Sequence, residues 1–202
     1  MCPGGFIVPS ATAPGELVVN GMSPSRRDGK FANSGIVASV ELEDLPEYQK
    51  FGPLAAMEFQ ADIEKKAWMY GGKTQAAPAQ RMVDFVEKRV SSNLLDTSYQ
   101  PGLNSVEMRD VLPDFISERL AMAFKAFGQK MKGYYTNDSQ LIGLESRTSS
   151  PVRIPRDRES FEHVQIKRLY PCGEGAGYAG GIVSAAMDGE RCAERLIEAY
   201  VK

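Results

Sequence analysis

Hydrophobic positions near the N-terminus follow the spacing of β-strands. Two short apolar runs at residues 6–8 and 17–19 are separated by the turn Ala13-Pro14-Gly15, which predicts two strands. Apolar residues then recur at every second position over residues 35–42, which is typical of a strand with one buried face. These segments together predict three strands.

The middle of the chain changes to helical spacing. Residues 53–70 carry apolar side chains near one stripe and end at Gly71-Gly72, and a second helix is expected to begin at Pro78. The clearest helix begins at Pro113 and ends at Gly133. Because each helix has one apolar face to bury, the three predict a small helical layer that covers another part of the protein.

Strand signals return after residue 140 and lead to a final helix. Short strands are expected at residues 141–146, 152–154 and 167–171, and a helix at residues 181–200. We expect this helix to bury an apolar face and expose a charged one. The buried set is Ile182, Ala185, Ala186, Ala193, Leu196, Ile197 and Tyr200, and the exposed set is Asp188, Glu190, Arg191, Glu194, Arg195 and Glu198.

The composition narrows the classes of protein. With 202 residues and 43% hydrophobic residues, the chain can bury an ordinary globular core. The net charge of −2 gives no general attraction to nucleic acid or to anionic lipid, and no apolar run is long enough to cross a bilayer. We therefore expect neither nucleic acid nor a membrane as a partner.

Cysteine and histidine are scarce. The three cysteines are an odd number without C-x-x-C spacing, which argues against a disulfide framework and favours the cytoplasm. The single histidine, His163, is expected in an exposed loop, and it rules out sites that need two imidazoles. No metal site is predicted.

The segment from residue 173 to residue 181 carries five glycines in nine residues. A glycine-dense turn between a strand and a helix can direct backbone N–H groups at an anionic ligand. Residues 175–180 satisfy G-x-G-x-x-G, but only one helix follows, so the βαβ unit of a first dinucleotide fingerprint is missing. Gly71-Gly72-Lys73-Thr74 is not a P-loop, because position 67 is Ala67 and a helix precedes it.

Residues 169–189 closely resemble the C-terminal flavin motif of flavoproteins with two dinucleotide-binding domains. In that motif a strand ends in Gly-Glu, and a Gly-Gly pair opens the last helix. The whole chain is similar to a bacterial family of FAD-dependent, NAD(FAD)-utilising dehydrogenases. The strings that carry this resemblance, besides the terminal motif, lie at residues 2–5 (CPGG), 19–27 (VNGMSPSRR), 31–35 (FANSG), 77–83 (APAQRMV) and 145–154 (ESRTSSPVRI).

The resemblance implies where FAD would bind. The residues after Gly-Glu would pass the ribityl and pyrophosphate groups, and the final helix would direct its N-terminus at the flavin N1/O2 edge. Reduced flavin is negative there, so free N–H groups would stabilise it. The implied cofactor-binding residues are Gly173, Glu174, Gly175, Gly177, Tyr178, Gly180, Gly181 and Ile182. A strand-to-helix turn that merely needs positive φ is the simpler alternative.

Two further segments are candidates for contact with substrate or flavin. Residues 147–156 combine arginines with hydroxyls and could position a phosphate or an anionic substrate, although such loops are commonly just solvated. The opening turn at residues 2–5 could lie near the flavin ring, with Cys2 as a redox partner or as an inert thiol. The residues concerned are Cys2, Gly4, Gly5, Arg147, Ser149, Ser150 and Arg153, and no catalytic acid or base is assigned.

The sequence thus predicts an α/β fold with three parts. Residues 1–35 would form the first strands of a partial FAD-binding, Rossmann-like domain, residues 36–139 an inserted and mainly helical cap, and residues 140–202 the C-terminal part of the FAD-binding domain. The chain opens on turn residues without a helix cap, so we expect a fragment. The resemblance implies that the first FAD fingerprint lies in an N-terminal segment supplied in cis or in trans.

The predicted function is that of the C-terminal part of an FAD-dependent oxidoreductase. By resemblance it would transfer hydride or electrons to an unidentified small-molecule substrate, with NAD(P)H as a candidate electron donor. A cofactor-free binding or scaffold module, or an inactive fragment, is the alternative.

Overall fold

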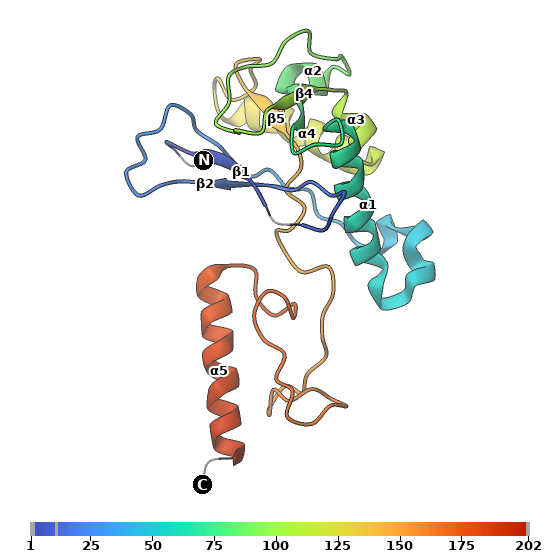
Figure 1. Cartoon of the computed structure of the whole chain (residues 1–202), viewed down its shortest axis with the longest axis vertical. Helices are drawn as coiled ribbons and strands as arrows, with labels where there is room; N and C mark the ends of the chain where they lie inside the picture. The colour runs from blue at the N-terminus through green and yellow to red at the C-terminus, as the bar shows by residue number, and fades with distance from the viewer. Residues whose placement is uncertain (1–2, 11, 201–202) are drawn as a thin grey trace. The chain divides into compact units, whose positions relative to one another are not determined.

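The chain folds into two compact units, which we describe from a computed structural model (Figure 1). The structure describes residues 3–10 and 12–200. The first unit comprises residues 1–46 and 59–146, and the second comprises residues 47–58 and 147–202. Among the described residues the chain is a mixed α/β protein with two small sheets and five α-helices.

The sheets of the first unit are short. Strands β1 (Phe6–Pro9) and β2 (Val19–Met22) form an antiparallel pair, with Phe6 opposite Met22. In the second sheet β3 (Ala77–Arg81) is central, parallel to β4 (Leu103–Ser105) and antiparallel to β5 (Gln140–Ile142). The Rossmann-like sheet and the domain boundaries after residues 35 and 139, both expected from the sequence, remain predictions.

Helices alternate with these strands. Two 3₁₀ segments, η1 (Leu42–Asp44) and η2 (Pro46–Leu54), precede α1 (Ala55–Tyr70). Helices α2 (Met82–Val86) and α3 (Met108–Val111) are single turns, and α4 (Asp114–Lys130) is the long amphipathic helix of the first unit. The helix α5 (Ile182–Tyr200) belongs to the second unit, whose residues 147–181 are largely irregular.

The core of the first unit lies between α4 and the turns around β3. Phe124 on α4 is 1% exposed and meets the fully buried Phe85 edge to face at 6.1 Å between ring centroids. Gln80 of β3 is also fully buried, and its amide is satisfied by the carbonyl of Arg89, the carboxylate of Glu107 and the N–H of Met108. This polar network ties β3 to the loops on both sides of it.

Four sequence-based predictions of secondary structure are wrong. Pro78 lies in the central strand β3 and not at a helix start, and the helix that follows begins at Met82. The carbonyl of Pro78 accepts the N–H of Gly143 at 2.9 Å, although the proline donates no hydrogen bond itself. Residues 35–41 form no strand, and the expected strands at residues 152–154 and 167–171 are irregular as well.

Candidate functional site

The glycine-rich turn of the second unit is held by its own backbone. The N–H of Gly177 donates to the carbonyl of Glu174 at 2.9 Å, and the N–H of Tyr178 donates to the carbonyl of Gly173 at 3.0 Å. Gly173 and Gly177 have φ values of 72° and 81°, where side chains other than hydrogen are strained. A Cβ on Gly177 would also lie 2.6 Å from the carbonyl oxygen of Val152. Local geometry therefore explains these two glycines.

Local geometry does not explain the glycines that open α5. Gly180 and Gly181 are not among the residues with positive φ, and a Cβ on Gly180 would meet no described atom within 4 Å. A Cβ on Gly181 would meet only the Ser184 hydroxyl, at 3.8 Å. Next to them, Ile182 is 90% exposed at the first position of α5. The described chain thus leaves room at this helix start for something to approach the backbone closely.

The arginine- and serine-rich loop lies against the glycine-rich turn. The Arg153 Nε donates to the carbonyl of Gly177 at 3.0 Å, and its guanidinium lies 5.0 Å from the centroid of the Tyr178 ring. The Ser150 hydroxyl bonds the carbonyl oxygens of Val152 and Gly175 at 2.8 and 3.3 Å. Two segments that the sequence singled out separately therefore meet in the structure.

These two segments line one open hollow of about 380 Å³. Its lining consists of Ser149, Ser150, Arg153, Gly177, Tyr178, Ala179 and Gly180. The wall combines hydroxyls, a guanidinium, an aromatic ring and backbone amides near a helix N-terminus, which is a chemistry suited to a ligand that is both anionic and aromatic. Six further predicted residues lie outside this lining but within the same unit, namely Arg147, Gly173, Glu174, Gly175, Gly181 and Ile182.

A buried ion pair connects the glycine-rich turn to α5. Arg156 donates two hydrogen bonds to the Asp188 carboxylate, at 2.7 and 3.0 Å, and a third to the carbonyl of Pro171 at 2.7 Å. Its guanidinium lies 3.7 Å from the ring centroid of Tyr178 and 4.2 Å from that of Phe161. Asp188 in turn accepts the N–H of Gly173 at 2.9 Å. The side chains of the pair are 8% and 11% exposed.

The Arg156 guanidinium holds the pKa of Asp188 below its ordinary value, and the hydrogen bond from Gly173 acts in the same direction. The ion pair was missed in the sequence, where Asp188 was expected to be exposed. No local pattern signals it, because the partners are 32 residues apart. The pair fixes the start of the glycine-rich turn on one face of α5.

The apolar side chains of α5 do not follow the sequence-based prediction either. Among its described side chains only Asp188 and Cys192 are buried. Ile182 is 90% exposed and Ile197 is 53% exposed, although both were expected to be buried. Asp188 and Cys192 are four residues apart and lie on one face of the helix.

The opening turn belongs to the first unit. Gly4 has a φ of 62°, and a Cβ there would collide with the backbone of Arg27, so this glycine is required where two segments cross. The N–H of Gly5 donates to the carbonyl of Phe31 at 2.8 Å, and the Ser23 hydroxyl donates to the carbonyl of Pro3 at 2.9 Å. Cys2 lies outside the described residues.

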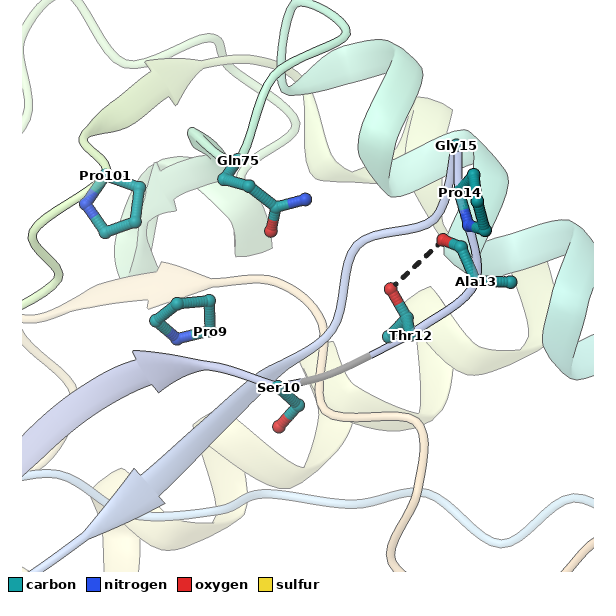
Figure 2. Close-up of a pocket in the computed structure, with 8 residues that line it drawn as sticks. All are labelled: Pro9, Ser10, Thr12, Ala13, Pro14, Gly15, Gln75 and Pro101. Atoms are coloured by element: carbon teal, nitrogen blue, oxygen red, sulfur yellow. Dashed lines mark hydrogen bonds between the residues drawn. The ribbon is translucent and has the colours of Figure 1, made fainter.

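A second hollow, of about 560 Å³, lies in the first unit (Figure 2). Its lining is Pro9, Ser10, Thr12, Ala13, Pro14, Gly15, Gln75 and Pro101. The Thr12 hydroxyl faces Ala13 and donates to its carbonyl at 3.4 Å, as Figure 2 shows. None of these described residues carries an ionisable side chain or was predicted as a site residue, so the hollow offers little chemistry.

The single histidine has a structural role. His163 Nδ1 accepts the N–H groups of Gln165 and Ile166, each at 3.0 Å, and so closes a turn. Over residues 3–10 and 12–200, no three His, Cys, Asp or Glu side chains gather closely enough to hold a metal ion. No helix in that part of the chain is both long and apolar enough to span a membrane.

Comparison with known proteins places the chain in a family. Residues 1–148 match the family described as FAD-dependent protein, C-terminal domain-like. The chain is also 45% identical over 202 residues to a protein from Clostridium beijerinckii (strain ATCC 51743 / NCIMB 8052) that is named only as uncharacterized. That match covers 99% of the chain and 37% of the relative, so the chain spans little more than a third of the relative's length. From the family match we conclude that this chain belongs to the FAD-dependent proteins and corresponds to their C-terminal domain-like region.

Proposed function

We propose that this chain is the C-terminal part of an FAD-dependent oxidoreductase and that the turn at residues 173–182 holds part of the flavin cofactor. The observation that carries the proposal is the pair Gly180 and Gly181, whose lack of side chains the described chain does not itself require. A cofactor ring or pyrophosphate that contacts the backbone would require it. The family to which the chain belongs supports FAD as that cofactor.

Each part of the turn has a role in this proposal. The backbone N–H groups of Gly180, Gly181 and Ile182 would face the negative edge of reduced flavin, because the first N–H groups of a helix lack partners within it. Arg153 would hold an anionic group of the cofactor or substrate in the hollow that it lines. When bound, FAD would supply the hydride or electron transfer, and this chain would orient it and provide electrostatic stabilisation.

The proposal includes a second protein segment in cis or in trans, which would carry the first FAD fingerprint. The exposed apolar side chains of α5 support it, because a stripe of this kind is normally covered. The C. beijerinckii relative has room for such a segment, since most of its length lies outside the match. We also propose a small-molecule substrate, and NAD(P)H as the electron donor; both rest on the resemblance of the sequence.

The test begins with the chain purified in excess FAD. Free ligand is removed, the protein is denatured, and released flavin is identified by absorbance and mass, first for the chain alone and then with the remainder of the C. beijerinckii relative added. Flavin in either arm is the expected result. Gly180→Val and Gly181→Val should then abolish binding, whereas Gly189→Val, at another open glycine on α5, should leave it intact.

Absence of flavin in both arms would refute the proposal and favour the alternative, a cofactor-free binding module or an inactive fragment. Equal loss of binding in all three valine variants would show that the effect is general and not due to the turn. If flavin binds, anaerobic addition of NADH or NADPH should bleach its absorbance. A spectrum that responds to neither would remove the nicotinamide donor from the proposal.

A further inference from the structure

Two cysteines lie together where the glycine-rich turn meets α5. Cys172 is exposed and directly precedes Gly173, whereas Cys192 on α5 is 5% exposed. The backbone on both sides of Cys172 is attached to the same face of the helix. The Pro171 carbonyl lies 3.9 Å from the Cys192 sulfur, and the Gly173 N–H bonds Asp188, one helical turn before Cys192.

The attachments leave Cys172 little freedom to move away from Cys192. Burial raises the pKa of the Cys192 thiol, and the hydrogen bond and charge of the Cys172 side chain add to that rise. The Cys172 thiol is thus close enough to the Cys192 thiol to contribute to its raised pKa. A lone buried cysteine is normally inert, but here an exposed thiol and a buried thiol lie side by side, as in a nucleophile with its resolving partner.

We propose that Cys172 and Cys192 are a redox-active dithiol that closes reversibly to a disulfide, with a small-molecule disulfide such as oxidised glutathione as the oxidant. This site is separate from the proposed flavin function, because the reaction needs no flavin. It places a covalent, reversible connection between residue 172 and α5, immediately before the glycine-rich turn.

The reaction proceeds in two exchanges. Cys172, which is accessible, loses its proton to water, and its thiolate attacks one sulfur of the oxidant. The sulfur–sulfur bond of the oxidant breaks, a mixed disulfide forms on Cys172, and the first small thiolate leaves. The Cys192 thiolate then attacks the Cys172 sulfur and releases the second small thiolate. The two protons from the protein end on the two small thiols, so the protein loses two electrons and the oxidant gains them.

Arg156 is positioned to assist the second exchange. Its Nη1 lies 3.2 Å from the Cys192 sulfur and can donate to it. A guanidinium at this distance favours the thiolate and opposes the effect of burial. The buried thiol therefore stays protonated at rest, and it has a cationic neighbour when it reacts.

The test uses the purified full chain and oxidised glutathione, followed by alkylation with N-ethylmaleimide and digestion with trypsin. Cleavage after Arg168, Arg191 and Arg195 places Cys172 in a peptide of residues 169–191 and Cys192 in a peptide of residues 192–195. We expect these two peptides to be joined in the oxidised sample and separate after dithiothreitol. Free thiols should fall from three per chain to one.

Three serine variants distinguish the pair from its alternatives. Cys2→Ser should still form the joined peptide, whereas Cys192→Ser should accumulate glutathione on Cys172 and Cys172→Ser should leave Cys192 alkylated. The proposal fails if both cysteines remain alkylated in the oxidised wild-type chain. It also fails if Cys172 is found joined to Cys2 or to a second chain. The wild-type measurement needs no variant, so a misfolded variant cannot decide the result.

Discussion

Removing Arg156 should loosen the glycine-rich turn of the second unit. The substitution Arg156→Met keeps the length of the side chain but leaves Asp188 as a carboxylate that is 11% exposed and has lost its cationic partner. Loss of one partner of a buried ion pair costs about 3 kcal/mol. Since 1.4 kcal/mol is about a factor of ten, the opening equilibrium of the turn should rise by about 100-fold.

Amide hydrogen exchange at pH 7 measures this opening directly. The N–H of Gly173 donates to Asp188, so its protection should fall by about 100-fold in Arg156→Met. The double variant Arg156→Met with Asp188→Asn should recover part of the loss, because asparagine still accepts from Gly173 but carries no charge. If Gly173 keeps its wild-type protection in Arg156→Met, the ion pair does not hold the turn, and our reasoning is wrong.

The same pair predicts a dependence on pH. Arg156 lowers the folded-state pKa of Asp188 below the ordinary value of 3.8. The pair therefore stabilises the turn fully above pH 3.8, and this stabilisation disappears as the pH falls through the lower folded-state pKa. Protection at Gly173 should fall in acid in the wild-type chain, and this acid step should be absent in Asp188→Asn.

Two further predictions concern stability. Gly177→Ala should destabilise the second unit by about 2 kcal/mol because of the positive φ of Gly177 and the close Val152 carbonyl. Gly180→Ala should change the stability of the unit by less than about 0.5 kcal/mol. Hydrogen exchange of the glycine-rich turn measures both effects, and equal effects of the two substitutions would contradict this reasoning. Phe124→Ala should destabilise the first unit by about 4 kcal/mol, because removal of a ring that is 1% exposed leaves a cavity. Urea unfolding measures this change, and a loss of stability below about 1 kcal/mol would contradict the assigned core.

The sequence predicted the long helices well and the short strands poorly. Helices α1, α4 and α5 appear where amphipathic spacing placed them, since a long periodic segment repeats the same signal several times. Strand β3 was mistaken for a helix because Pro78 is common at helix starts, and only its neighbours β4 and β5 make it a strand. Strands this short are decided by pairing between distant segments, which a local pattern does not contain.

The candidate site was predictable in its parts but not in its assembly. Glycine density identified the turn at residues 173–181, and the cluster of arginine and serine identified the loop that contains Ser150 and Arg153. That these segments share one hollow follows from contacts such as the one between Arg153 and Gly177, 24 residues apart. Arg156 was assigned to the same loop, yet its partner on α5 appears only when the chain is folded.

The division of the chain into units has a consequence for the order of folding during synthesis. The first unit takes in residues 59–146 and is complete once residue 146 has left the ribosome. The second unit combines residues 47–58 with residues 147–202, so it cannot be complete until this later segment has been made. A nascent chain from which residue 150 has just left the ribosome would therefore already contain the α4 core but not the Arg156–Asp188 pair. The speed of translation beyond residue 146 then sets how long residues 47–58 wait for the rest of their unit.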